Sequence, residues 1–306
     1  MSVVPSTPLP RLTQAFAPLT HASQALNELG EAVKVHMPAE RALTVYVDKR
    51  ELVTLMTLGA CPELLVLGYL RNQRLVDNAA DIESITVDWV VGAAAAKTRH
   101  GLVDIERKTA KKTVTTGCGQ GSVYGDLMDD VDNIRLPQAA KPHLSQATLY
   151  AVVNAIRLKE STYKSAGSVH ACALFKGEEL LCFVEDVGRH NALDTIAGWM
   201  WMNGVASSLD LVFYTTGRLT SEMVIKSAQM GVPVVVSRSG ITQMGLAVAQ
   251  QLGLCTIGRA TNKRFLLYSG EERFKPQPAL AESKSTADFG VQKVQTVTEF
   301  PISNTV

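Results

Sequence analysis

A single cysteine, Cys118, stands among small residues in the stretch KKTVTTGCGQGSVYG, which runs from Lys111 to Gly125. Nearby cations lower the pKa of a thiol, and flexible glycines let another molecule reach it. Four such cations are close in sequence, at Arg107, Lys108, Lys111 and Lys112. Cys118 therefore fits a nucleophile or a carrier of a small group. The alternative is an incidental loop cysteine, which has no neighbouring cysteine for a local disulfide or metal chelate.

Arginines recur where predicted strands end in the second half of the chain. Four successive predicted strands lead into a turn with a glycine and an arginine, namely Arg189, Arg218, Arg238 and Arg259. In open α/β sheets, ligands bind beyond the carboxyl ends of the strands, and the arginine fork matches phosphate oxygens. We therefore expect a pocket for a polyanionic ligand, whereas the alternative is four solvated loop charges. Neither a dinucleotide-binding G-x-G-x-x-G after a first strand nor a G-x-x-x-x-G-K-[ST] motif is present.

Two histidines are further candidates, both with ordinary structural alternatives. His170 lies in the apolar strand SVHACALF, where a lone histidine is more often a core residue, and Cys172 shares its face. His190 follows the first arginine turn. The acidic residues Asp194 and Glu222 are interpreted as helix N-terminal charges. The remaining cysteines lie in apolar settings and are expected to be buried and inert, namely Cys61, Cys182 and Cys255.

The composition is that of an ordinary globular protein. The 306 residues are 46% hydrophobic, with a formal net charge of +1, which gives no overall attraction to nucleic acid or acidic lipid. The five cysteines include no C-x-x-C pair, so a zinc knuckle has no support. The first residues do not resemble a signal peptide, and the apolar run VDWVVGAAAA is too short to span a bilayer. We expect a cytoplasmic protein with reduced thiols, no nucleic-acid partner and no membrane association.

Local patterns divide the chain into four parts: a loose N-terminal arm over residues 1–38, a small α+β domain over 39–114, an α/β domain over 115–275 and a disordered tail over 276–306. In the second part, strands flank a turn at Asp48 and Lys49, and a helix begins at Pro62. In the third part, a helix capped by Ser145 precedes strands that alternate with helices. Short, branched apolar strands in such an alternation predict a largely parallel sheet covered by helices.

Several of these segments together resemble the formate dehydrogenase accessory sulfurtransferase family, FdhD. The resemblance lies in TTGCGQGS, GSVHACALF, EDVGRHNALDTIAG, TTGRLTSEMVIKSAQMGVPVVVSRSGITQMGLAVA and IGRATNKRFLLYSG, with matching order and approximate spacing. CPELLVLGYLRNQRLV is similar to a further family segment. The resemblance covers residues 40 to 270.

The resemblance implies a cytidine deaminase-like three-layer α/β domain with a small N-terminal α+β domain. It also implies a cytoplasmic, homodimeric sulfurtransferase that accepts persulfide sulfur from a cysteine desulfurase. That sulfur passes to the bis(molybdopterin guanine dinucleotide) molybdenum cofactor of formate dehydrogenase. The persulfide carrier corresponds to Cys118, and the cofactor-binding segment to Phe265, Leu266, Leu267, Tyr268, Ser269 and Gly270. In the mechanism that we expect from these residues, His170 or His190 would assist proton transfer.

The sequence departs from the family pattern in the cysteine loop. Many members have C-G-x-C, whereas this chain has Cys118-Gly119-Gln120-Gly121, so no second loop thiol can relay the sulfur. This keeps open a cofactor-binding chaperone that inserts the molybdenum cofactor without covalent sulfur transfer, and also a generic nucleotide-binding regulator. The H-x-E and P-C-x-x-C zinc signature is missing, so we expect no structural metal and no deaminase activity.

Overall fold

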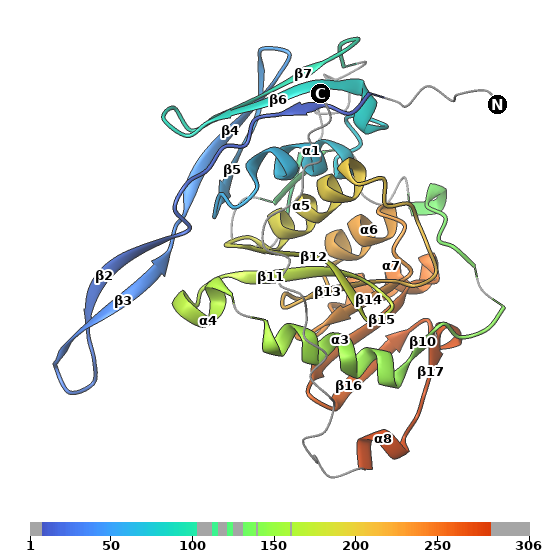
Figure 1. Cartoon of the computed structure of the whole chain (residues 1–306). Helices are drawn as coiled ribbons and strands as arrows, with labels where there is room; N and C mark the ends of the chain where they lie inside the picture. Colours follow the sequence, from blue (N-terminus) through green and yellow to red (C-terminus); the bar gives the residue numbers. More distant parts are fainter. Residues whose placement is uncertain are drawn as a thin grey trace.

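The computed structural model describes residues 8–102, 112–115, 121–124, 131–138, 140–159 and 161–282, with only the backbone described for 112–115 and 121–124. In these residues, two β-sheets lie on either side of a layer of helices (Figure 1). Cys118 and residues 283–306 lie outside the described residues.

The N-terminal sheet has five strands in the order β1-β6-β7-β4-β5. Their bounds are β1 Arg11–Leu12, β4 Arg41–Val47, β5 Arg50–Thr57, β6 Ile82–Asp88 and β7 Ala93–Thr98. The predicted turn between β4 and β5 is confirmed, because Asp48 and Lys49 both have positive φ, at 46° and 72°, as a tight hairpin turn requires. Helix α1, Pro62–Asn72, covers the apolar face of this sheet and begins at the predicted proline.

The larger sheet has six strands in the order β12-β11-β13-β14-β15-β16. Their bounds are β11 His170–Lys176, β12 Glu179–Asp186, β13 Leu211–Thr215, β14 Val234–Ser237, β15 Cys255–Thr261 and β16 Arg264–Ser269. The prediction of a largely parallel sheet is wrong. Only the pairings of β13 with β14 and of β14 with β15 are parallel, and the other three pairings are antiparallel. Two of these pairings have a local reason, because β11–β12 and β15–β16 are joined by short turns, which can link only antiparallel strands. The third, β11–β13, pairs strands that are separated in the chain by β12 and α5.

Helices cover both faces of the larger sheet, which makes three layers (Figure 1). Helix α3, Gln146–Leu158, packs on one face and begins at the predicted Ser145, whose hydroxyl accepts a hydrogen bond from the Thr148 amide. The other face carries α5 (Arg189–Met202), α6 (Ser221–Gln229) and α7 (Gln243–Leu252). Thr220 precedes α6 but makes no side-chain capping bond, whereas Gly253 ends α7 with a left-handed φ of 62°.

Helices α1 and α5 join the two sheets through a close crossing. A Cβ atom on Gly68 would lie 1.6 Å from the Asp194 carbonyl oxygen, and one on Gly198 would lie 2.1 Å from the Leu64 carbonyl oxygen. Only glycine permits this approach of two backbones. The N-terminal unit is therefore fixed directly against the helix that follows the first arginine turn.

The expected loose N-terminal arm contains regular structure in the described residues, so this prediction is wrong. Strands β2, Thr20–Leu26, and β3, Ala32–Pro38, form an antiparallel hairpin that extends away from the rest of the chain (Figure 1). The pairing of two distant halves of this segment, rather than local periodicity, creates the strands. At the other end, α8, Ala279–Glu282, occupies the start of the predicted tail.

Short elements complete the described residues. The strand pairs are β8 (Lys112–Thr115) with β9 (Gly121–Tyr124), and β10 (Leu144–Ser145) with β17 (Phe274–Lys275). The helical ones are α4 (Thr162–Ala166) and the 3₁₀ turns η1 (Ala79–Asp81), η2 (Val131–Asn133) and η3 (Glu271–Arg273). The domain boundary expected between residues 114 and 115 falls inside β8. None of the helices in the described ranges is long and apolar enough to cross a membrane.

Candidate functional site

The register of the larger sheet brings the four arginines to one edge, although Arg259 lies at an irregularity within β15 and not in a turn after it. Strands β12, β13, β14 and β15 all end there, and β11 begins there at His170. Backbone hydrogen bonds join neighbouring turns, from the Arg238 amide to the Thr215 carbonyl at 3.0 Å and from the Arg259 amide to the Ser239 carbonyl at 2.8 Å. Arg218, Arg238 and Arg259 are exposed. The structure thus brings the predicted arginines together at one edge of the sheet. That these arginines bind a ligand stays a prediction.

Arg189 differs from the other three because it is only 4% exposed. Its side chain crosses Gly217 of the next turn, where an added Cβ atom would lie 2.6 Å from the Arg189 Cδ atom. Together with Arg218, it lowers the pKa of His170, after the larger effect of burial. Because Arg189 is buried, the alternative that it is a solvated loop charge is wrong.

Side-chain hydrogen bonds hold the turns in place. The Ser237 hydroxyl donates to the Gly217 carbonyl at 2.7 Å, and the Ser239 hydroxyl donates to the Thr216 carbonyl at 2.9 Å. An added Cβ atom on Gly240 would meet no atom within 4 Å, so space remains open beside these turns. A preformed edge of this kind can bind a ligand without first ordering its loops.

The predicted cofactor-binding segment forms β16 and the residue after it. Phe265 packs against the rings of Tyr150 and Phe274, with centroids 6.3 and 5.4 Å apart, and thus belongs to the core over α3. Leu267 packs against the same core, and Ser269 and Gly270 fit tightly against β15. Leu266 is 48% exposed. Tyr268 lies against Gly258, where an added Cβ atom would be 2.7 Å from its ring. Most residues of the segment therefore pack inside the protein, whereas Leu266 and Tyr268 face away from the core over α3.

His170 is half-buried at the start of β11. Its Nδ1 atom lies 3.4 Å from the Thr216 hydroxyl, and burial and the two arginines lower its pKa, which favours the neutral ring. It lines an open groove of about 420 Å³ together with Pro38, Glu40, Ser168, Val169 and Val187. Cys172, two residues on, is fully buried, and burial raises the pKa of its thiol to about 12. Cys172 is therefore an inert thiol, as are Cys61, Cys182 and Cys255, whose pKa values are also raised by burial.

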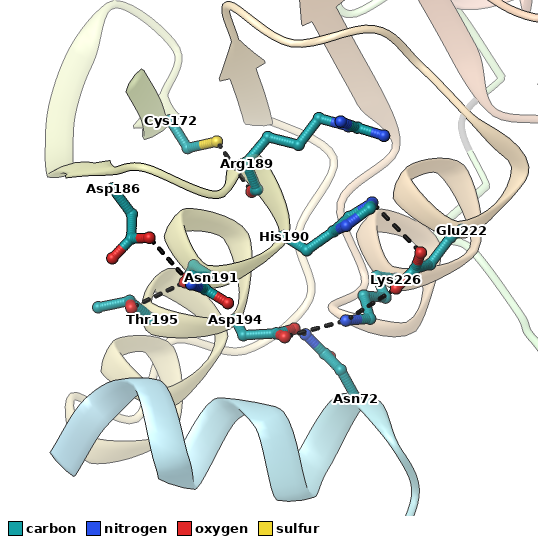
Figure 2. Close-up of polar contacts among 10 residues, drawn as sticks. All are labelled: Asn72, Cys172, Asp186, Arg189, His190, Asn191, Asp194, Thr195, Glu222 and Lys226. Carbon is teal, nitrogen blue, oxygen red and sulfur yellow. Dashed lines mark hydrogen bonds and ion pairs between the residues drawn. The ribbon is translucent and has the colours of Figure 1, made fainter. Parts of the chain in front are cut away.

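A buried network of charges begins beside the arginine edge, as Figure 2 shows. Lys226 Nζ lies 2.9 Å from Asp194 Oδ2 and 3.3 Å from Glu222 Oε1, and His190 Nε2 lies 3.3 Å from Glu222 Oε2. Asn72 of α1 donates to Asp194 Oδ1 at 2.7 Å. The two carboxylates raise the pKa of Lys226 against the effect of burial. Burial, Lys226, Arg189 and His170 lower the pKa of His190 to about 3, although Glu222 opposes them.

Asp194 lies beyond the first turn of α5, so its interpretation as a helix N-terminal charge is wrong, whereas Glu222 does lie in the first turn of α6. Their side chains are only 2% exposed, and they hold a lysine that is 3% exposed. The available signal was the presence of Asp194 and Lys226 between apolar residues, in ALDTIAG and MVIKSA. Periodicity alone could not show that charges on two helices meet.

A second buried carboxylate, Asp186, ties the N-terminal unit to the end of β12. It accepts hydrogen bonds from the Thr57 hydroxyl, the Leu58 and Gly188 amides and the Asn191 side chain. Burial raises its pKa, whereas these donors act in the opposite direction. Asp186 thereby fixes the Gly188 turn from which Arg189 and His190 project.

Cys118 lies outside the described residues, so the structure does not test its predicted role. Its neighbouring strands β8 and β9 pair antiparallel, with Thr115 opposite Gly121. In the ranges that the structure describes, no group of three or more His, Cys, Asp or Glu residues could hold a metal ion.

Comparison with known proteins gives one consistent result. The model of the FdhD/NarQ family matches residues 38–275. The sulfur carrier protein FdhD of Bacillus subtilis is 30% identical over 250 residues, covering 81% of this chain and 94% of that protein. The protein of the same name from Listeria innocua is 28% identical over 243 residues, covering 79% and 93%. A crystal structure assigned as a formate dehydrogenase accessory protein from Desulfotalea psychrophila has a TM-score of 0.66 and 23% identity, over 84% of this chain and 100% of that one. This last likeness concerns the mixed α/β fold.

Proposed function

This chain belongs to the FdhD/NarQ family, and from this we propose that it is a sulfur carrier required for formate dehydrogenase activity. The observation that carries the proposal is the family match over residues 38–275, together with relatives named sulfur carriers that align over more than nine-tenths of their own length. The sulfur comes from a cysteine desulfurase and passes to the bis(molybdopterin guanine dinucleotide) molybdenum cofactor.

Cys118 is the carrier in this proposal. Its thiolate attacks the terminal sulfur of the desulfurase persulfide, so that a new S–S bond forms, the old one breaks and the desulfurase cysteine leaves as a thiolate. The outer sulfur then moves from Cys118 to the molybdenum of the cofactor as a neutral atom. The molybdenum supplies the two electrons of the new Mo–S bond, and Cys118 is released as a thiolate. One thiol suffices for both steps, which suits a loop that has Gln120 and Gly121 in place of a second cysteine.

The arginine edge holds the cofactor in this proposal. A bis-guanine dinucleotide carries two pyrophosphates, and the exposed Arg218, Arg238 and Arg259 gather at one edge. Arginine binds phosphate oxygens through parallel N–H bonds. Leu266 and Tyr268 of the predicted segment face away from the core over α3, and Tyr268 lies against Gly258 beside Arg259. These placements support a cofactor site that extends from the arginine turns to β16.

We also propose that residues 115–275 form a cytidine deaminase-like domain. Support comes from the three layers, with α3 on one face of the mixed sheet and α5, α6 and α7 on the other. The chain lacks the H-x-E and P-C-x-x-C residues that would bind zinc and activate water, so the fold carries no deaminase chemistry. The protein acts in the cytoplasm as a homodimer, in contact with the desulfurase and with formate dehydrogenase.

The central experiment incubates the purified chain with a cysteine desulfurase and cysteine and measures intact mass. We expect one added sulfur on the wild-type protein and none on Cys118→Ala. Cys61→Ala is the matched control, because burial raises the pKa of Cys61 to about 12 and its loss should leave the loading unchanged. In the host, Cys118→Ala should abolish formate dehydrogenase activity. Undiminished activity in that variant would refute the carrier role.

A chaperone that inserts the cofactor without covalent sulfur transfer is the second candidate, favoured by the missing second cysteine. It predicts normal cofactor binding with no sulfur on Cys118 in the same mass measurement. Arg238→Ala and Arg259→Ala should weaken cofactor binding in either case, whereas Lys176→Ala, at the end of β11 opposite the arginine edge, should not.

A further inference from the structure

The β2–β3 hairpin, residues 20–38, is an arm with two open edges. It projects from the body of the protein (Figure 1), and in the described residues it forms a sheet of two strands only. An isolated two-stranded hairpin is marginally stable in water, and unpaired edges tend to pair with another chain. Nearly all of it precedes the family-matched region, which begins at residue 38. Membership of the FdhD/NarQ family therefore does not explain what this hairpin does.

The two edges of the arm are not equivalent. Natural edge strands are commonly protected by lysine or proline. Strand β3, with the sequence AVKVHMP, carries Lys34 and Pro38, whereas β2, with the sequence THASQAL, carries neither a Lys, Arg, Asp or Glu nor a proline. The β2 edge is thus the unprotected one.

The register shows which backbone groups of β2 point outward. The Asn27 amide donates to the Glu31 carbonyl, and the Ala39 amide donates to the Leu19 carbonyl, so Leu19 and Asn27 belong to hydrogen-bonded pairs. Such pairs alternate with non-hydrogen-bonded ones along an antiparallel ladder. It follows from the register that four residues of β2 direct their N–H and C=O groups away from β3, namely Thr20, Ala22, Gln24 and Leu26.

An antiparallel copy of β2 complements this set of groups. With the two-fold axis at Ser23, Ala22 lies opposite Gln24 of the partner subunit, and Thr20 lies opposite Leu26 of the partner subunit. All four outward-facing residues can then exchange pairs of hydrogen bonds, and no like charges are opposed. A two-fold contact of this kind is self-complementary and closes on itself.

One face of the arm also carries exposed apolar side chains, which are unfavourable in water. Residues paired across the hairpin share a face, so Val33, Val35 and Met37 lie together on one face of the arm, while Lys34 and His36 lie on the other. Val33 is 37% and Met37 48% exposed. A four-stranded sheet would join two such apolar faces side by side, which adds contacts across the new pair of strands.

We propose that the β2–β3 arm is a dimerisation surface, in which β2 pairs antiparallel with β2 of a second copy of this chain about Ser23. This surface gives the homodimer of the proposed function a location, but it involves neither Cys118 nor the arginine edge and so can be tested separately from sulfur carriage.

The first test measures the molar mass of the full chain by light scattering after size exclusion. We expect twice the 33.0 kDa chain mass for the wild type. Gln24→Pro removes one outward N–H without touching a bond within the hairpin, and should yield a monomer. His36→Pro is the matched control, because it removes an outward N–H from β3 and should leave the dimer intact. A dimer that survives both Ala22→Pro and Gln24→Pro overturns the proposal.

The second test is a crosslink. The two Ser23 residues would form a non-hydrogen-bonded pair with Cα atoms about 4.5 Å apart, within the range that a disulfide spans. Ser23→Cys should therefore give an interchain disulfide under mild oxidation, mapped by peptide mass, whereas Lys34→Cys should not. A wild-type monomer without a Ser23→Cys crosslink overturns the proposal. Sulfur loading of Cys118 should be unchanged in Gln24→Pro, which separates this proposal from the proposed function.

Discussion

The crossing of α1 and α5 gives the most direct test of how the two sheets are joined. The perturbation is Gly68→Ala, which would place a methyl group 1.6 Å from the Asp194 carbonyl oxygen and adds a contact near the Gly198 amide at 2.7 Å. A carbon atom and an oxygen atom in contact need about 3.2 Å, so the two backbones would have to separate by roughly 1.5 Å.

The expected cost follows from three contributions. Overpacking between rigid elements costs about 1–3 kcal/mol. Separation also stretches the bond from Asn72 to Asp194, now 2.7 Å, and a buried hydrogen bond to a charged group contributes about 1.5–3 kcal/mol. Alanine in a helix recovers up to about 1 kcal/mol relative to glycine. The net loss in the free energy of unfolding is therefore about 3 kcal/mol.

The assay is urea unfolding followed by tryptophan fluorescence. Trp201 reports on this crossing, because the Arg71 guanidinium of α1 lies 5.0 Å from its ring centroid. Gly240→Ala is the control, since its added methyl group meets nothing within 4 Å, and it should change stability by less than about 0.5 kcal/mol. If Gly68→Ala proves as stable as Gly240→Ala, the two helices do not pack this closely and the reasoning is refuted.

Three further predictions concern thiols, pH and the buried network. Iodoacetamide at pH 8 should label Cys118 in the native protein, as measured by peptide mapping. Burial raises the pKa of the other four thiols, Cys61, Cys172, Cys182 and Cys255, which should react slowly. Rapid labelling of any of these four would contradict the structure. The pKa of His190 falls from 6.5 to about 3 on folding, so the unfolded chain binds a proton that the folded chain does not. Stability should therefore decline as pH falls from about 6.5 toward 3, and less so in His190→Asn, as measured by urea unfolding across that range. Lys226→Met leaves the carboxylates of Asp194 and Glu222 buried without their cation, and should lower the free energy of unfolding by about 3–5 kcal/mol. Adding Asp194→Asn should restore part of this loss. Equal stability of Lys226→Met and the wild type would contradict the ion pairs.

Local signals predicted most of the individual elements. The turn at Asp48 and Lys49, the helix start at Pro62 and the cap at Ser145 all follow from residues within a few positions of one another. Such features depend on φ preferences and on hydrogen bonds that are local in sequence. They can be read without any knowledge of the fold.

Strand direction and the arm were mispredicted because pairing is a long-range property. The alternation of strands and helices suggested a parallel sheet, yet the strands that meet across short turns run antiparallel. The segment of residues 1–38 lacks periodicity, and its strands exist because residues 20–26 pair with residues 32–38. Hydrogen bonds between strands depend on a partner that no local window contains.

By itself, the sequence determined the family, through motifs whose order and spacing the match over residues 38–275 confirms. It also determined that the arginine turns would share an edge, because successive strand ends of one sheet meet there. Only the tertiary structure decided that Arg189 is buried over Gly217, and that Lys226 joins Asp194, Glu222 and, through Asp194, Asn72. The reason is that burial and ion pairing depend on which helix faces meet. That meeting is fixed by the close packing of Gly68 and Gly198 from distant parts of the chain.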